Sequence, residues 1–483
     1  MKRDQSEAQV SSSVALWWIR RDLRLSDNQT LAAALAEAKQ VVPVFVLDPA
    51  LWKSPNVGSN RLAFLLGGLH QLDADLRARG SRLIVRQGRP RQELAALRTG
   101  TGAGKIFAEQ DHSGYARQRD AEIARHLPLH LISSLTVHPP AAVLKADGKP
   151  YTVFTPFSRA WKALMLPSLN SVLPAPERIW SPADVRSDAI PPEPALPSSV
   201  PFVPGEAEAQ HRLSLFLDPD DPAIYRYGEG RNRMDWNGTS QLSPYLRFGM
   251  LSARQVAVAA YSAIESAPSQ STRASAETWL NEIIWREFYI SILYHFPGVS
   301  RQAFRADLRD IPWRNDLQEF EAWCEGHTGY PLVDAAMRQL KQTGWMHNRA
   351  RMIAASFLVK DLLMDWRWGE RWFMQNLVDG DLAANNGGWQ WTAGVGTDAA
   401  PYFRVFNPVL QGQRFDPDGA YVRRWVPELE NVPSKFIHQP WEMPADVQRA
   451  SGCLVGCDYV TPLVDHTGAR AHAQRLSSCS ILD

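Results

Sequence analysis

The sequence predicts an α/β N-terminal domain, built on a doubly wound parallel sheet, followed by an all-α C-terminal domain. Over residues 14–108, short apolar runs alternate with helix-forming segments, which is typical of a parallel sheet covered by helices on both faces. Residues 167–222 contain 12 prolines, which disfavour long helices and indicate an extended, Pro-rich linker. Beyond residue 222 the apolar residues recur with helical spacing, and 13 of the 18 tryptophans lie there.

The N-terminal elements follow from the apolar runs and the segments between them. We expect strands over 14–19, 41–47, 82–86 and 105–108, and helices over 31–38, 61–79 and 91–98. Ser26, Asp27 and Asn28 can cap the first of these helices. The expected boundaries are a flexible tail over 1–13, an α/β domain over 14–140, a linker over 141–222 and a helical domain over 223–483.

Composition excludes several classes of protein. The 52 Lys and Arg nearly balance the 51 Asp and Glu, so a nucleic-acid partner would have to be held by a local basic patch. The four cysteines are irregularly spaced, which argues against a metal site or a disulfide framework. The chain shows no uncharged apolar run of membrane-spanning length and its N-terminus lacks the apolar core of a signal peptide, so we expect a cytoplasmic protein with no membrane contact.

The run DGDLAANNGGWQW, residues 379–391, concentrates two carboxylates, three amides, three glycines and two tryptophans. Such a segment suits the polar edge of a planar ligand. We expect Gly387 and Gly388 to end any helix that begins before them. A helix cap followed by buried aromatic residues is the alternative.

Two helical segments add polar groups at core-like spacing. Over 276–294 the three- and four-residue steps place Trp279, Glu282, Trp285 and Arg286 on one face, as in a pocket wall. The segment MHNRARM, residues 346–352, opens a second such helix. An amphipathic core helix whose arginine pairs locally remains the alternative for this second segment.

These segments together closely resemble the photolyase and cryptochrome family of flavoproteins, most of all the class I cyclobutane pyrimidine dimer photolyases. The matching motifs are WIRRDLRLSDN (18–28), FTPF (154–157), WLNEIIWREFY (279–289), MHNRARMIAASFLVKDLLMDWR (346–367), DGDLAANNGGWQW (379–391) and GTDAAPYFRVFNP (396–408). The resemblance implies an antenna-binding α/β domain and a helical domain that holds FAD, active as FADH⁻. The missing G-x-G-x-x-G fingerprint disfavours a flavin oxidoreductase that uses NAD(P)H.

The resemblance also implies which residues bind FAD. Those at positions that hold the phosphates and the ribityl chain are Tyr227, Thr239, Ser240, Gln241, Leu242 and Ser243. Those around the adenine and isoalloxazine rings are Trp279, Arg286, Asn348, Arg351, Asp379, Asp381 and Asn385. In this assignment Arg351 pairs with Asp379 and supplies positive charge to the reduced anion, and Asn385 faces flavin N5. Simple helix capping is the alternative for the hydroxyl residues 239–243.

The implied activity is light-dependent DNA repair, in which an electron from photoexcited FADH⁻ splits a cyclobutane pyrimidine dimer in UV-damaged DNA. Met346-His347-Asn348 stands where enzymes for (6-4) photoproducts carry two adjacent histidines. Glu282 and Asn348 are expected to hydrogen-bond the dimer. A cryptochrome-like blue-light photoreceptor without repair activity is the alternative.

The remaining assignments concern DNA, electron transfer and the antenna. We expect Trp285, Trp391 and Met352 to contact the dimer, Arg231 and Arg349 to bind the flanking phosphates, and Trp389, Trp366 and Trp313 to carry electrons to the flavin. The alternative for Arg231 and Arg349 is a plain surface role, and the alternative for Trp389, Trp366 and Trp313 is core packing. The segments LDPALWKS (47–54) and EQDHSGYARQRD (109–120) resemble the family members with an 8-hydroxy-5-deazaflavin antenna, although His112 and Ser113 depart from that pattern. Methenyltetrahydrofolate, a second flavin or an empty antenna site are the alternatives. A monomer is expected.

Overall fold

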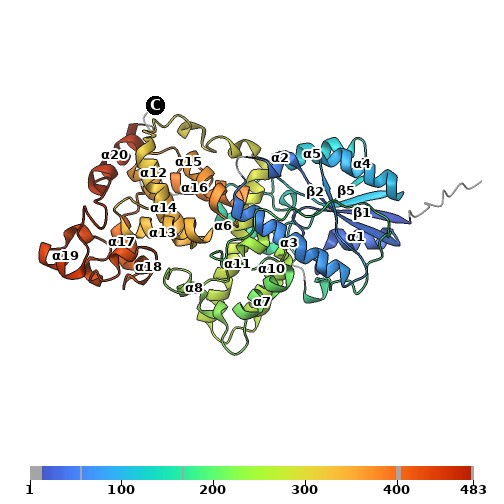
Figure 1. The fold of residues 1–483 in the computed structure, drawn as a ribbon, viewed down its shortest axis with the longest axis horizontal. Coiled ribbons are helices and arrows are strands. Elements are labelled where there is room, and N and C mark those ends of the chain that lie inside the picture. The colour runs from blue at the N-terminus through green and yellow to red at the C-terminus, as the bar shows by residue number, and fades with distance from the viewer. Residues whose placement is uncertain (1–12, 55–56, 166–167, 399–403, 480–483) are drawn as a thin grey trace, which may run out of the picture.

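A computed structural model describes residues 13–54, 57–165, 168–398 and 404–479. The α/β domain and the helical domain lie side by side, with the sheet at one end of the molecule (Figure 1). The predicted fold class is confirmed. The tail expected at the N-terminus lies outside the described residues except for Ser13.

The sheet contains five parallel strands in the order β3-β2-β1-β4-β5. The strands are β1 (Val14–Ile19), β2 (Gln40–Leu47), β3 (Ile84–Gln87), β4 (Lys105–Glu109) and β5 (Leu129–Ile132), and the helices are α1 (Gln29–Glu37), α2 (Pro49–Trp52), α3 (Ser59–Arg77), α4 (Pro90–Thr101) and α5 (Gly114–Ala124). The strand order changes direction between β1 and β4, so the loops after these strands flank the crevice where ligands of such folds bind.

Alternate residues of β1 explain why both faces of the sheet are covered. Trp17 packs in the core with α1 and α3, whereas Trp18 packs in the core with α4 and α5. The first of these cores continues across the domain boundary to Trp279 in the helical domain. The two domains therefore share one hydrophobic core.

The Pro-rich segment contains more helix than its composition predicts. Helix α6 (Phe154–Ala163) precedes the dense prolines, and α7 (Glu206–Phe216) lies among them. The expectation of no long helix is wrong for α7, because no proline occurs between Pro204 and Pro219.

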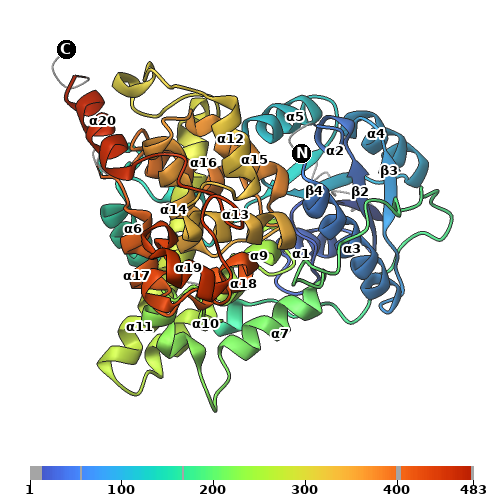
Figure 2. The same ribbon diagram turned by 60° about the vertical axis from the view of Figure 1, so that its left-hand side comes forward.

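The helical domain is organised around α11 (Gln270–His295), which packs against the neighbouring helices on several sides. The other helices are α8 (Tyr227–Gly230), α9 (Ser243–Phe248), α10 (Ala253–Glu265), α12 (Leu317–Glu325), α13 (Pro331–Thr343), α14 (Asn348–Ser356), α15 (Trp366–Asn376), α16 (Leu382–Ala393), α17 (Pro408–Phe415), α18 (Ala420–Trp425), α19 (Ala445–Ser451) and α20 (His466–Cys479). Helix α20 lies on the side of this domain away from the sheet (Figures 1 and 2). None of the helices described here is long and apolar enough to cross a membrane.

Helix α16 corrects one prediction, because it runs unbroken through Gly387 and Gly388. The glycines serve close packing here. A Cβ added to Gly387 would lie 2.1 Å from a ring carbon of Tyr289 in α11. The helix begins instead at Asp381, which caps it, and ends at Gly394 in the left-handed region, with φ of 81°.

Candidate functional site

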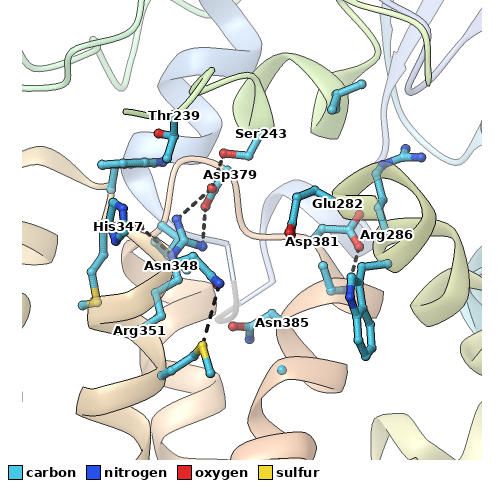
Figure 3. A pocket seen from close by; sticks show the side chains of 18 of the residues that line it. Thr239, Ser243, Glu282, Arg286, His347, Asn348, Arg351, Asp379, Asp381 and Asn385 are labelled. Carbon is cyan, nitrogen blue, oxygen red and sulfur yellow. Dashed lines mark hydrogen bonds and ion pairs between the residues drawn. The ribbon is translucent and has the colours of Figure 1, made fainter. Parts of the chain in front are cut away.

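A cavity of about 550 Å³ opens between α9, α11, α14, α16 and the loop that precedes α9 (Figure 3). All of the residues predicted to bind cofactor or substrate line it. They are Tyr227, Arg231, Thr239, Ser240, Gln241, Leu242, Ser243, Trp279, Glu282, Trp285, Arg286, Asn348, Arg349, Arg351, Met352, Asp379, Asp381, Asn385 and Trp391, together with Trp389 of the electron-transfer set. Segments that are far apart in the sequence therefore build one site.

Arg351 and Asp379 form the predicted ion pair. Two guanidinium nitrogens lie 2.8 and 3.2 Å from the two carboxylate oxygens, and the Ser243 hydroxyl donates to the same carboxylate at 2.6 Å (Figure 3). Arg351 also donates to the Met346 carbonyl at 2.8 Å. These bonds fix the arginine in one orientation, with its charge at the cavity wall.

The loop before α9 enters the cavity wall in a strained conformation. Gln241 adopts φ of +50°, which side chains other than glycine rarely take, and its amide donates to Asn237 at 2.7 Å. The Trp279 indole donates to the Ser240 hydroxyl at 3.2 Å, which ties this loop to α11. The loop therefore presents hydroxyl and backbone groups on a fixed scaffold, as phosphate binding requires.

The wall carries an excess of positive charge. Five arginines and three carboxylates line the cavity: Arg231, Arg247, Arg286, Arg349 and Arg351 against Glu282, Asp379 and Asp381. Burial, with the repulsion of Arg21, lowers the pKa of Arg247 to about 9, which leaves it charged at neutral pH. This balance suits a ligand that bears phosphates and a reduced, anionic ring.

Several buried polar groups at the cavity wall await a partner. The ring nitrogens Trp345 Nε1, His347 Nε2 and Trp389 Nε1 have no hydrogen-bond partner among the described residues. Burial, together with Arg349 and Arg351, lowers the pKa of His347 to about 4, so its ring is neutral at pH 7. Polar atoms left unpaired in an otherwise packed wall fit a cavity made for a large polar ligand.

Asn385 has a defined orientation. Its amide nitrogen donates to the Glu370 carbonyl at 3.0 Å, and this bond fixes the orientation of the side-chain amide. Its carbonyl oxygen is therefore the end that can accept a hydrogen bond from a ligand.

Gly388 widens the cavity between the lining side chains. Beyond its chain neighbours and the nearby backbone of its own helix, an added Cβ would meet no described atom within 4 Å, in contrast to the neighbouring Gly387. The residues present thus fit the isoalloxazine and phosphate groups of FAD in charge, in donor set and in space.

The residues predicted to contact DNA lie on the same cavity, but they also contact one another. Arg231 forms an ion pair with Glu282 at 2.6 Å. Arg349 donates to Asn232 at 2.6 Å, and its guanidinium lies 4.7 Å from the centroid of the Phe415 ring. Burial raises the pKa of Glu282, and Arg231 and Arg349 oppose that shift. The sequence did not predict the pairing of Glu282 with Arg231.

The apolar side of the cavity is partly preassembled. Trp285 stacks on Phe154 of α6, with ring centroids 3.7 Å apart and the planes 3° from parallel. The Asn348 amide contacts the Met352 sulfur at 3.8 Å (Figure 3). Phe154 belongs to the FTPF motif, so this part of the linker helps to hold Trp285.

The tryptophans predicted to carry electrons lie in one hydrophobic core. Trp389 and Trp366 are buried, and Trp313 is half-buried at its edge. A Cβ on Gly369 would lie 2.1 Å from the Trp389 ring, so α15 and α16 approach closely at this point. Trp323, which the sequence did not single out, is also buried here, with its ring centroid 6.2 Å from that of Trp389.

Two arginines of the N-terminal domain also reach the site. Arg21 donates to Asp381 at 2.6 Å, and Arg61 of α3 donates to the Met374 carbonyl in α15. Neither contact could be read from the sequence, because the partners lie hundreds of positions apart. The only signal was the charged run RRDLR after the first strand.

The two segments proposed for the antenna meet beside the sheet. Asp48 follows β2 and Tyr115 lies in α5, and the Tyr115 hydroxyl donates to the Asp48 carboxylate. Ser113 caps α5, and His112 packs edge-on against Tyr294 of α11, with ring centroids 5.4 Å apart.

A parallel α/β domain is packed on a helical domain, and the helical domain holds a large pocket with an excess of arginines. This arrangement defines a two-domain protein whose pocket suits a phosphate-bearing cofactor. Residues 15–177 match the family model described as DNA photolyase, and residues 279–478 match the FAD binding domain of DNA photolyase. The chain therefore belongs to the DNA photolyase family, and its helical domain is an FAD-binding domain.

Individual relatives agree with this assignment. The chain is 42% identical to a deoxyribodipyrimidine photo-lyase of Synechococcus, over 87% of its own length and 89% of that protein. A bacterial class III photolyase from Agrobacterium tumefaciens has a similar structure, with a TM-score of 0.91, 36% identity and coverage of 99% and 100% of the two chains. A cryptochrome from Synechocystis follows, with a TM-score of 0.87, 30% identity and coverage of 96% and 99%.

Proposed function

We propose that the protein is a light-dependent repair enzyme for cyclobutane pyrimidine dimers in UV-damaged DNA. The observation that carries the proposal is that the residues assigned to the cofactor and those assigned to the dimer line one continuous cavity. A donor and an acceptor bound there would lie within one water-poor space, as electron transfer between them requires.

Bound and fully reduced, FAD would supply an electron to the dimer on illumination and take it back after the ring splits. The side chains of the protein would position the bound FAD and stabilise its negative charge. Arg351, locked by Asp379, holds positive charge beside the reduced ring. Asn385 offers an acceptor oxygen, which binds an N–H group without supplying a proton.

The substrate side of the cavity would hold the dimer outside the duplex. Enzymes that act on a damaged base, photolyases among them, remove it from the stack at a cost of about a few kcal/mol. Contacts with Trp285 and Trp391, at about 1–3 kcal/mol each, can offset that cost. Glu282 and Asn348 would supply the hydrogen bonds that select a pyrimidine edge.

Arg231 would have two partners in turn. Without DNA it neutralises Glu282. With DNA, the flanking phosphate would attract Arg231 and free the carboxylate for the dimer. Arg349 would bind the second phosphate.

Class I membership and a cyclobutane dimer specificity are parts of this proposal. Asn385 and the Met346-His347-Asn348 sequence support it. The rival function, a blue-light photoreceptor without repair, is supported by the similarity in structure to the Synechocystis cryptochrome. The contact between Asp48 and Tyr115 joins the two segments on which an 8-hydroxy-5-deazaflavin antenna was assigned, with methenyltetrahydrofolate as the alternative.

One experiment tests the function. Purified protein is reduced and illuminated with oligonucleotides that contain either a thymine dimer or a (6-4) photoproduct, and a dark sample serves as the control. We expect repair of the thymine dimer alone. Glu282→Ala should slow this repair, whereas Glu277→Ala should not, because Glu277 lies on the same helix but pairs at the surface with Arg273. Absence of light-dependent repair by the reduced parent protein would sink the proposal.

A further inference from the structure

Arg21 connects the α/β domain to the wall of the cofactor cavity. It lies two residues after β1, at the carboxyl edge of the sheet. Its side chain crosses to the helical domain, where it donates to Asp381 at 2.6 Å and to the Arg247 carbonyl at 3.3 Å. The Arg21 side chain is 16% exposed and that of Asp381 is 12% exposed, so the pair is largely shielded from water.

The two oxygens of Asp381 have separate tasks. One oxygen accepts from the backbone N–H groups of Ala383 and Ala384, at 2.9 and 3.1 Å, and so caps α16. The other oxygen accepts from Arg21. Arg21 therefore fixes the first turn of the helix that carries Asn385 and Gly388 into the cavity.

Several arginines act on the Asp381 carboxylate. Arg247 lies 3.9 Å from Asp381, and Arg286 also acts on it. Burial opposes ionisation of Asp381, but the arginines outweigh it and hold its pKa well below the usual range. Asp111 of the α/β domain lies 4.0 Å from Arg21, and Glu109 also acts on this arginine. Arg21, Arg247 and Arg286 all act on Asp381, and Arg21 contributes one of these positive charges.

We propose that Arg21 is a positioning residue of the cofactor site, supplied by the α/β domain, that favours the reduced flavin through its charge and its hold on Asp381. The inference rests on the proposed FAD site. A positive charge behind the wall stabilises an anionic ring more than a neutral one, so its removal lowers the reduction potential of bound FAD.

The test is a potentiometric titration of FAD bound to the holoprotein. In Arg21→Gln the affinity for reduced FAD relative to oxidised FAD should fall about tenfold, which is about 30 mV for a two-electron couple. Arg21→Lys keeps the charge and should recover most of the shift. Arg20→Gln is the matched control, because the adjacent Arg20 pairs with Asp120 inside the α/β domain, at 2.6 Å.

A second variant separates charge from structural support. Asparagine caps helices as well as aspartate, so Asp381→Asn should preserve the start of α16 while it removes a negative charge. We expect Asp381→Asn to shift the potential upward, and Arg21→Gln with Asp381→Asn to return it toward the parent value. This measurement also decides the matter if Arg21→Gln does not fold.

The outcomes are distinct. An unchanged potential in Arg21→Gln, with a less stable apoprotein, would make Arg21 a structural tie between domains and overturn the inference. An unchanged potential in Asp381→Asn would do the same. A parent protein that binds FAD but repairs no dimer would refute the proposed function alone, since the potential is measured without DNA.

Discussion

Gly387 and Gly388 are neighbours in α16 with opposite surroundings, and they provide a sharp test of the cavity. A Cβ at Gly388 would project into the space that it lines, with no described atom within 4 Å apart from its chain neighbours and the nearby backbone of its own helix. A Cβ at Gly387 would lie 2.1 Å from the Tyr289 ring. Alanine at the two positions therefore makes the same chemical change in open and in filled space.

The magnitudes follow from this geometry. Alanine is more favourable than glycine inside a helix by about 0.8–1 kcal/mol, so Gly388→Ala should raise the free energy of unfolding of the apoprotein by about 1 kcal/mol. In Gly387→Ala the same gain is offset by overpacking, which costs about 1–3 kcal/mol, so we expect a net loss of about 1 kcal/mol. If FAD fills the space beside Gly388, the new methyl group should weaken its binding about 5- to 150-fold.

Urea unfolding of the two apoproteins measures the first effect, and titration of FAD by quenching of flavin fluorescence measures the second. A Gly388→Ala protein that binds FAD as tightly as the parent would refute the placement of the cofactor beside α16. A Gly388→Ala apoprotein less stable than the parent would contradict the open space beside α16.

Three further changes test the site, the electron path and a buried carboxylate outside the cavity. Asp379→Asn weakens the bonds to Arg351, so FAD should bind about 30-fold less tightly, a loss of about 2 kcal/mol; equal affinity would contradict this. Trp313→Phe should block photoreduction of oxidised FAD but spare repair by pre-reduced enzyme, and photoreduction at the parent rate would reject the assigned path. Burial raises the pKa of Glu287 from 4.5 to about 7. The folded protein then binds this proton more tightly than the unfolded chain, so the free energy of unfolding falls as pH rises from about 4.5 to 7. Glu287→Gln should flatten that fall in urea unfolding at a series of pH values, and an unchanged slope would contradict it.

The sequence predicted the central sheet because its strands are apolar on both faces. Val14–Ile19 is buried throughout, and its predicted limits match those of β1. Strand β5 was missed because it lies at the sheet edge, with His130 and Leu131 exposed, and shows no apolar run. Helix α5 was missed for a similar reason, since few of its side chains are buried.

The candidate site was predictable where a motif carries it, and not where distant segments meet. Asp379 and Arg351 lie in two recognisable motifs, and their ion pair is confirmed. The pairing of Arg231 with Glu282 depends on the path of the chain between α8 and α11, which local spacing does not determine. The sequence could not show that α16 is unbroken, because glycine can serve close packing as well as a turn. Gly387 serves close packing because the Tyr289 ring lies opposite it.

The contact of α3 with α15 bears on how the protein is made. Arg61 donates to the Met374 carbonyl, and a Cβ on Gly58 would lie 2.1 Å from the Gln375 carbonyl oxygen, so the end of α15 rests directly on the α/β domain. Domains of nascent chains generally fold in the order in which they leave the ribosome. The α/β domain is complete in sequence long before α15 is synthesised. The folded α/β domain would then offer the later helices a surface on which to pack. If the α/β domain misfolded, the helices that form the cavity would also be misplaced.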